Sequence, residues 1–297
     1  RCWGHGGFGQ LGDGRREDSA TPVEVTGLER VTALAAGEHH SCAIVDGQVL
    51  CWGAGARGQL GDGGFVDRLA PTAVEALQDV VALGAGRAHS CALLASGSVW
   101  CWGEDADAEL GRGQITRPEG ADPTPAAVVG LVDVRSLHVG WGHACALNAA
   151  GEARCWGRAD AFQLGDRRGG EQASVSATPV LAEVEDVRDV AAGAMHTCFA
   201  LGSGRVRCVG AGYHGQLGAG GQTPHRRPVD VPGLAHVVAV AAGQSHSCAL
   251  LESDEVRCWG NPHSGRVGPH ADERARREPS PVRVIAPLAS RRPRAQP

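Results

Sequence analysis

The hydrophobic residues of this chain fall in short runs, and the pattern of runs repeats about every fifty residues. One unit holds a proline-led run (21–25), a run that ends at glycine (31–37), a run with His-Ser-Cys (40–44) and a run with Cys-Trp-Gly (49–53). Each run has the length of a strand and is alternating or β-branched, and Gly, Pro, Asp and Ser separate the runs without helical periodicity. The pattern predicts an all-β protein.

The cysteines of the fourth run give the period of the repeat, since they stand at Cys2, Cys51, Cys101, Cys155, Cys208 and Cys258. Such a period fits a four-stranded blade of a β-propeller and is too long for a leucine-rich or hexapeptide solenoid. The first and fourth runs occur six times, but the second and third occur five times. We therefore expect five complete units and one partial unit, with the chain beginning on a last strand and ending on a first strand.

The third and fourth runs predict a hairpin in which two cysteines face each other. Asp46-Gly47 favours a two-residue type I′ turn, and counting outward from this turn sets Cys42 opposite Cys51. Three-residue loops in the other hairpins, centred on Ser96, Ala150, Ser203 and Ser253, have the same effect on cysteines ten residues apart. All these pairs fall at non-hydrogen-bonded sites, where Cα atoms roughly 4.5 Å apart permit a disulfide.

Five disulfides are thus predicted: Cys42–Cys51, Cys91–Cys101, Cys145–Cys155, Cys198–Cys208 and Cys248–Cys258. Cys2 is expected to stay unpaired because its partner strand is missing. Disulfides persist in oxidising compartments, which predicts an extracellular, cell-surface or periplasmic protein. No export signal is visible, but the chain opens at Arg1 without a methionine.

Residues 51–63 (CWGAGARGQLGDG), followed by Pro71, Gly86 and the run His89-Ser90-Cys91-Ala92-Leu93, resemble the repeats of the regulator of chromosome condensation family. The match extends from Cys2 to about Ile285. The resemblance implies a propeller, usually with seven blades, in a family of guanine-nucleotide exchange factors, chromatin binders and secreted bacterial binders. The paired cysteines are similar to those of exported bacterial members. We expect one domain over residues 1–285 and a disordered Arg/Pro-rich tail over 286–297.

Charge and hydropathy narrow the choice of partners. The net charge is −5 and the isoelectric point is about 6.2, which argues against nucleic acid because phosphate binding needs clustered cations. No apolar run approaches the ~20 residues that span a bilayer. We expect a monomer that binds another protein.

Three segments match a dinucleotide-binding fingerprint, at residues 4–9, 53–58 and 210–215. The fingerprint needs a helix and a βαβ unit to follow, and the pattern predicts neither. We interpret these glycines as turn residues and predict no cofactor.

Two residue types recur at fixed places of the repeat and admit a functional or a structural interpretation. The histidines His40, His89, His143, His196 and His246 could hold a metal if they converged, but a repeated structural hydrogen bond is favoured and no metal site is predicted. The tryptophans Trp3, Trp52, Trp102, Trp156 and Trp259 could stack on a ligand, but packing between blades is favoured.

Some equivalent positions carry a different residue in each repeat, so the fold does not require a particular side chain there. Such positions are candidates for binding. Between the glycine of the second run and the histidine of the third, the candidate contact residues are Glu38, His39, Arg87, Trp141, Met195 and Gln244. The connections 104–122 and 158–176 are a second candidate, and ordinary exposed turns are the alternative for both.

The leading hypothesis for function is a non-enzymatic protein-binding scaffold, with exchange activity toward a small GTPase as the alternative. The sequence contains no nucleophile elbow, zinc-protease helix or phosphate loop. The members of a catalytic triad need only meet in space, however. An enzyme would be indicated by carboxylates or histidines of shifted pKa clustered in the central funnel.

Overall fold

The computed structural model describes residues 1–115, 120–166, 175–263, 266–267 and 278–284. In these ranges the chain forms strands and turns without an α-helix, and every strand pair is antiparallel. No helix there could cross a membrane. The tail predicted at 286–297, and the domain end at 285, lie outside the described residues.

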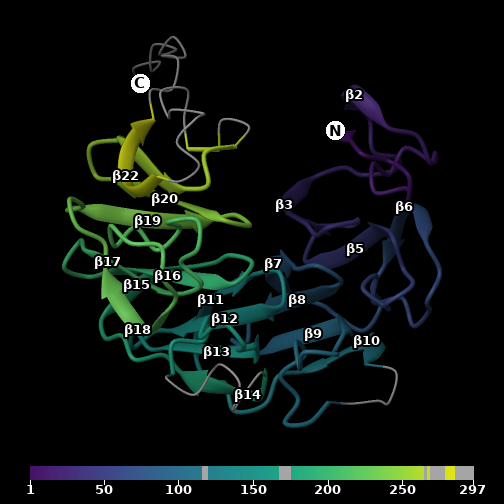
Figure 1. Cartoon of the computed structure of the whole chain (residues 1–297). Helices are drawn as coiled ribbons and strands as arrows, with labels where there is room; N and C mark the ends of the chain where they lie inside the picture. The colour runs from purple at the N-terminus through teal and green to yellow at the C-terminus, as the bar shows by residue number, and fades with distance from the viewer. Residues whose placement is uncertain (116–119, 167–174, 264–265, 268–277, 285–297) are drawn as a thin grey trace, which may run out of the picture.

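Five four-stranded sheets follow one another around an arc, each made of four consecutive strands (Figure 1). We call them blades 1 to 5. From the central axis outward the strands are β3 (Val31–Ala36), β4 (His40–Val45), β5 (Gln48–Gly53) and β6 (Arg68–Ala73) in blade 1; β7 (Val80–Ala85), β8 (His89–Leu94), β9 (Val99–Glu104) and β10 (Ala121–Ala127) in blade 2; β11 (Val134–Val139), β12 (His143–Asn148), β13 (Ala153–Arg158) and β14 (Val175–Leu181) in blade 3; β15 (Val187–Ala192), β16 (His196–Leu201), β17 (Val206–Gly210) and β18 (His225–Asp230) in blade 4; and β19 (Val237–Ala242), β20 (His246–Leu251), β21 (Val256–Gly260) and β22 (Glu278–Val284) in blade 5. The molecule is a β-propeller of four-stranded blades.

A two-stranded partial blade, β1 (Cys2–Gly4) with β2 (Ser19–Val23), precedes blade 1. The expected five complete units and one partial unit are therefore present. The phase of the repeat was predicted wrongly, because each proline-led strand pairs with the preceding Cys-Trp-Gly strand and forms the outer edge of that blade. The last described strand, β22, is thus the fourth strand of blade 5. Proline suits this place because the outer strand needs N–H donors on one side only.

The hairpins have the predicted register. Val45 pairs with Gln48, and Asp46 and Gly47 both have positive φ, as a type I′ turn requires. The three-residue loops centred on Ser96, Ala150, Ser203 and Ser253 are also found. All five predicted disulfides form, with Cα–Cα distances of 4.0–4.1 Å, and Cys2 is free.

Neighbouring blades are joined through one backbone carbonyl at each boundary. The carbonyl of Gln59 accepts hydrogen bonds from Trp102 Nε1 at 2.9 Å and from Ser90 Oγ at 3.0 Å. Equivalent tryptophan bonds run to Gln10, Glu109 and Gln216. Trp52, Trp102, Trp156 and Trp259 are fully buried, which confirms their predicted packing role, whereas Trp3 in the partial blade is 64% exposed.

The inner ends of the blades approach one another too closely for side chains. A Cβ on Gly86 would lie 2.6 Å from the carbonyl oxygen of Gly140 in the next blade, and it would also overlap the ring of His89. The backbone N–H of Trp141 in turn donates to Gly193 at 3.1 Å. Glycine at this position therefore allows the inner strands to surround a narrow axis.

Candidate binding face

The candidate contact residues of the turns and the described parts of the connections 104–122 and 158–176 lie on one face of the propeller. Residues 116–119 and 167–174 of these connections lie outside the described residues. His89 at the start of β8 pairs with Gly103 near the end of β9, and Ala121 at the start of β10 pairs with Glu104. The turn between the first two strands of blade 2 therefore meets the connection 104–122 at the same edge. In blade 3, Arg158 and Val175 pair in the same way at that edge. The two candidates form one surface.

A cavity of about 510 Å³ opens on the propeller axis within this face. It is lined by the last residues of the five inner strands and by the glycines that follow them, together with Glu38, Trp141 and Gln244. Arg87 lines a neighbouring cavity described below. His39 instead packs against Phe8, with ring centroids 4.7 Å apart, and Met195 is half-buried and lines neither cavity. Four of the six predicted contact residues thus converge around two adjacent cavities.

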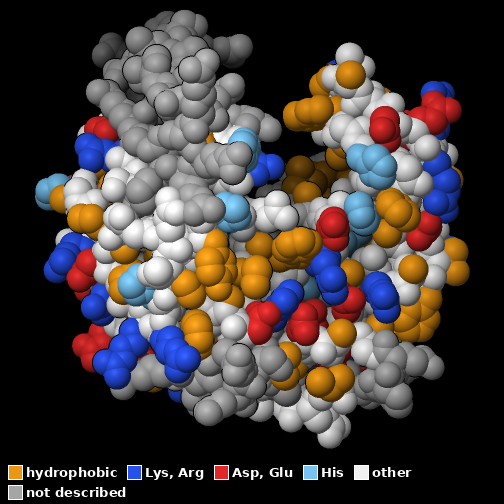
Figure 2. All heavy atoms as spheres, in the orientation of Figure 1, with side chains coloured by type: hydrophobic (Ala, Val, Ile, Leu, Met, Phe, Trp, Pro, Cys, Tyr) orange, Lys and Arg blue, Asp and Glu red, His pale blue; other side chains and the backbone are white. Residues whose placement is uncertain are grey.

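The second cavity, of about 60 Å³, lies between blades 2 and 3 and is called the rim pocket here. Its lining residues are Arg87, Asp107, Glu109, Trp141, Gly142, Arg158 and Ala194. Arg87 Nη2 lies 2.5 Å from Glu104 Oε2, and Arg158 Nη2 lies 2.6 Å from Asp160 Oδ2. Figure 2 shows acidic and basic side chains gathered side by side on this surface. The pocket therefore combines opposite charges with a large aromatic side chain.

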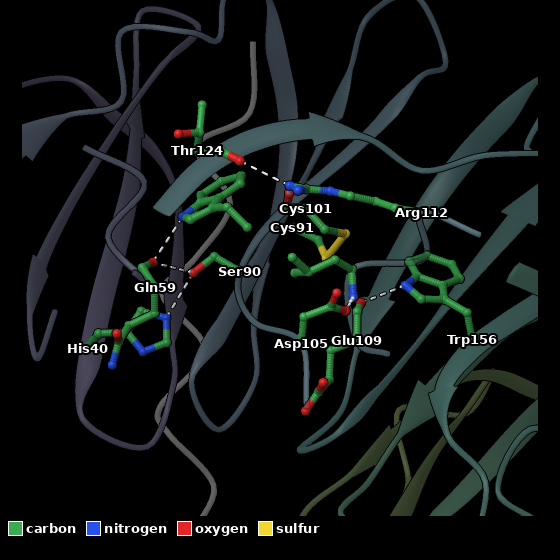
Figure 3. Close-up of a disulfide and its surroundings, with 12 residues drawn as sticks. His40, Gln59, Ser90, Cys91, Cys101, Asp105, Glu109, Arg112, Thr124 and Trp156 are labelled. Carbon is green, nitrogen blue, oxygen red and sulfur yellow. Dashed lines mark hydrogen bonds between the residues drawn. A yellow bond between two sulfur atoms is a disulfide. The ribbon is translucent and has the colours of Figure 1, made fainter. Parts of the chain in front are cut away.

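Arg112 fixes the connection that carries Asp107 and Glu109. Its Nη2 donates to the carbonyl oxygens of Cys101 and Thr124 at 2.7 and 2.9 Å (Figure 3). Its Nη1 lies 2.6 Å from Asp122 Oδ2. A buried arginine bonded to two strands stabilises the start and the end of the connection. The rim pocket thus stands on a fixed base.

Glu109 is the least expected residue of the rim pocket. Its oxygen Oε2 accepts the backbone N–H of Asp107 at 2.8 Å, and in the other repeats a glutamine makes the same bond at positions Gln10, Gln59, Gln163 and Gln216. The Glu109 side chain is 1% exposed, and burial, with smaller contributions from Asp107 and Glu104, raises its pKa to about 8. Asp107, Glu109 and Arg158 lie within the predicted candidate connections 104–122 and 158–176, but they were not distinguished there from the other residues of these connections. The visible signal was a glutamate at a position where four repeats have glutamine.

The recurrent histidines connect blades rather than bind a ligand. Nε2 of His40 lies 2.9 Å from Ser90 Oγ (Figure 3). Because the Ser90 hydroxyl donates to the Gln59 carbonyl, it accepts from Nε2–H of His40. The other ring nitrogen, Nδ1, is buried without a partner, which favours the neutral ring. His143 with Thr197 and His196 with Ser247 repeat the contact at 2.8 Å, which confirms the predicted structural hydrogen bond at three boundaries.

His89 is the exception, because Ala144 stands where the next blade would supply a hydroxyl. Neither ring nitrogen of His89 has a hydrogen-bond partner, and the residue is fully buried. Burial lowers the pKa to about 4 for His40 and His143 and to about 3 for His89 and His196. Within the described residues, no three His, Cys, Asp or Glu side chains gather as a metal site.

Ser136, His138 and Asp189 meet on the inner strands and could suggest a catalytic triad. His138 Nε2 lies 3.0 Å from Ser136 Oγ and 3.9 Å from Asp189 Oδ1, so both partners face the same ring nitrogen. A triad needs the serine and the carboxylate on opposite nitrogens of the ring. Burial lowers the pKa of His138, while Asp189 Oδ2 accepts the backbone N–H of Val240. This arrangement is not that of an acyl-transfer site.

Fold and face together define a disulfide-containing β-propeller with a variable loop surface around its axis. The family model described as RCC1-like domain matches residues 1–292, and the chain belongs to this family. Its repeats are those of the regulator of chromosome condensation type, as the sequence motifs indicated.

Two curated relatives and two solved structures show the range of similar proteins. The human E3 ubiquitin-protein ligase HERC2 is 32% identical over 242 residues, which are 78% of this chain and 5% of that protein. The Ultraviolet-B receptor UVR8 of Arabidopsis thaliana is 28% identical over 76% of this chain and 40% of its own length. Human WBSCR16 has a TM-score of 0.79 at 24% identity, covering 94% of this chain and 74% of its own. Prp20p of Saccharomyces cerevisiae has a TM-score of 0.64 at 20% identity, covering 96% and 85%.

The chain therefore spans a small part of HERC2 and less than half of UVR8. Identities below 25% mean that WBSCR16 and Prp20p support the fold alone.

Proposed function

We propose that this chain is a non-enzymatic, monomeric propeller that binds a protein partner outside the cytoplasm through the face described above. The observation that carries the proposal is the contrast between a repeated frame and unlike loops around a common cavity. The frame repeats its tryptophan, carbonyl and disulfide contacts, while the loop positions carry Glu38, Trp141 and Gln244. Aromatic and polar side chains at a concave surface are typical of protein interfaces.

The cysteines support a location in an oxidising compartment. Ten of the eleven are paired within single blades, and disulfides of this number are rare in reducing cytosol. With a net charge of −5, the chain also lacks the basic surplus that a nucleic-acid partner would require.

Nucleotide exchange on a small GTPase is the second candidate. It is favoured by the likeness to Prp20p, whose structure is described together with its binding to Gsp1p and histones. That description concerns Prp20p, and the five disulfides weigh against a cytosolic partner here. Release of labelled GDP from a panel of small GTPases tests this candidate, and acceleration by this chain would replace the first proposal.

The binding proposal can be tested with two variants, one that alters the proposed binding face and one that alters another part of the surface. The face variant Glu38→Ala, Trp141→Ala, Gln244→Ala changes three exposed side chains around the axial cavity. The control variant Glu152→Ala, Glu185→Ala changes the hairpin end of blades 3 and 4, away from the cavity. Each protein is cross-linked to extracellular proteins of the source organism, and captured proteins are quantified by mass spectrometry.

We expect a partner that is captured by the wild-type protein and the control variant but is depleted with the face variant. Equal capture by all three proteins would contradict the proposal.

A further inference from the structure

The boundary between blades 2 and 3 departs from the repeat at three places at once. Glu109 replaces the repeat glutamine, Ala144 replaces the Ser or Thr that bonds the preceding histidine, and the turn after Gly140 carries the 36% exposed Trp141. The other boundaries keep the glutamine, and Ser90, Thr197 and Ser247 keep the hydroxyl. Glu109 and Trp141 line the same rim pocket. The departures therefore coincide with the pocket.

The rim pocket is lined by two acidic and two basic side chains, and the carboxylates of Glu104 and Asp160, which pair with the two arginines, bring the acidic groups around it to four. Its two arginines are already paired, Arg87 with Glu104 and Arg158 with Asp160. Among the described residues, no cation lies within ion-pair distance of the Asp107 or Glu109 carboxyl groups, and the Glu109 carboxyl is bonded by the backbone N–H groups of Asp107 and Glu109. These two carboxyl groups face a pocket that can accept one further positive charge.

A glutamate buried at position 109 should cost more folding free energy than a glutamine would, because an ionisable group is removed from water. Glutamine accepts the same backbone hydrogen bond in four repeats without placing an ionisable group in a buried site. A residue that lowers stability, at a position where an uncharged residue would fit, is typical of a functional site.

We propose that the rim pocket receives an arginine side chain of the partner protein, with its guanidinium group held by Asp107 and Glu109 against the ring of Trp141. This inference rests on the proposed function and names the chemistry of the partner. Arginine fits better than lysine because its planar group can bond two carboxylates and also stack on an aromatic ring. Arg87 and Arg158 flank the pocket and remain occupied by their own carboxylates.

Binding of a cation here is coupled to loss of a proton from Glu109. The charged groups that face Glu109 are Asp107 and Glu104 on its own connection, Arg87 from the β7–β8 turn and Arg158 at the end of β13. A guanidinium group supplies the charge that favours the ionised carboxylate. The affinity for arginine should therefore rise between pH 6 and pH 8.

The test uses acetyl-arginine amide as a probe and the indole N–H signal of Trp141 in an NMR spectrum as the readout. The Trp141→Phe variant assigns the signal, and acetyl-citrulline amide, which has a similar shape without the charge, is the control ligand. We expect the signal to shift with the arginine probe, and the affinity to fall about tenfold in Glu109→Gln and in Asp107→Asn. In Glu109→Gln the pH dependence should disappear.

Equal shifts with the citrulline probe, or unchanged affinity in both variants, would overturn the inference. Its failure is separable from failure of the proposed function. A partner captured through the face although arginine does not bind would leave the proposed function standing. Arginine binding without any captured protein would count against that function and not against the pocket.

Discussion

Nε2 of His40 and Oγ of Ser90, 2.9 Å apart, join one blade of the propeller to the next. The contact requires a proton on Nε2, since the hydroxyl's own proton is donated to the Gln59 carbonyl, and burial with no partner for Nδ1 keeps the His40 ring uncharged. Four histidine rings, those of His40, His89, His143 and His196, are buried, and desolvation lowers the pKa of each.

Acid should therefore unfold the protein at a higher pH than protonation of its carboxylates alone would. Because the folded pKa of these rings is about 3 to 4 and the unfolded value is near 6.5, stability is full above pH 6.5 and declines as pH falls toward 4. Each ring contributes about 1.4 kcal/mol per pH unit in that window. Urea unfolding at pH 7, 6, 5 and 4 measures the decline, and a flat profile would show that the rings are protonated in the fold.

Ala144→Ser should stabilise the protein by about 1 kcal/mol, because it supplies the missing partner of His89 and completes the contact seen at the other boundaries. The measurement is the free energy of unfolding at pH 7. Ala92→Ser is a suitable control, because it places a hydroxyl among the buried apolar residues of blade 1 and blade 2 and should destabilise the protein. Destabilisation by both changes would argue against the contact.

Glu109→Gln should stabilise the protein, and the gain should grow with pH. The folded pKa of Glu109 is raised to about 8 from 4.5, so its contribution to stability is full below pH 4.5 and is lost as pH rises toward 8. The variant should match the wild type near pH 4 and exceed it at pH 8. Gln59→Glu, the reverse exchange at an equivalent buried position, should lose stability with the same pH dependence. A gain independent of pH would show that Glu109 is ionised in the fold.

Non-reduced protein should contain one titratable thiol, Cys2, and reduced, unfolded protein should contain eleven. Removing one bridge with Cys198→Ala and Cys208→Ala should cost about 2.5–3 kcal/mol in unfolding free energy, because the bridge closes a short loop in the unfolded chain. Cys2→Ser, at a half-buried and unpaired position, should change stability little. Ten further reactive thiols in the native protein would contradict the disulfides and the proposed location.

Much of the fold could be predicted because its information is local. The pairing of Cys42 with Cys51 follows from the two residues of the intervening turn, and it repeats with the sequence. The sheet to which each proline-led strand belongs was not predictable in this way. A proline-led strand could pair with a strand of the repeat that precedes it or of the repeat that follows it. Which partner it takes depends on which sheet has an open edge beside it.

The candidate site was predicted in part for the same reason. Positions such as Trp141 and Arg87 could be found by comparing repeats, because they differ at an equivalent place. Their meeting with Asp107 and Glu109 depends on how the connection 104–122 folds back over the blade, which the period of the repeat does not determine. The substitution of glutamate for glutamine was nevertheless visible in the sequence.

The placement of every bridge within one hairpin has a consequence for biogenesis. Bridged cysteines are nine or ten residues apart in the sequence. The correct partner of each one is therefore the cysteine nearest to it in the sequence. A blade can thus be oxidised as soon as its hairpin leaves a ribosome or a translocation pore, before later repeats exist. Mispaired intermediates should be few, and maturation should depend little on an isomerase.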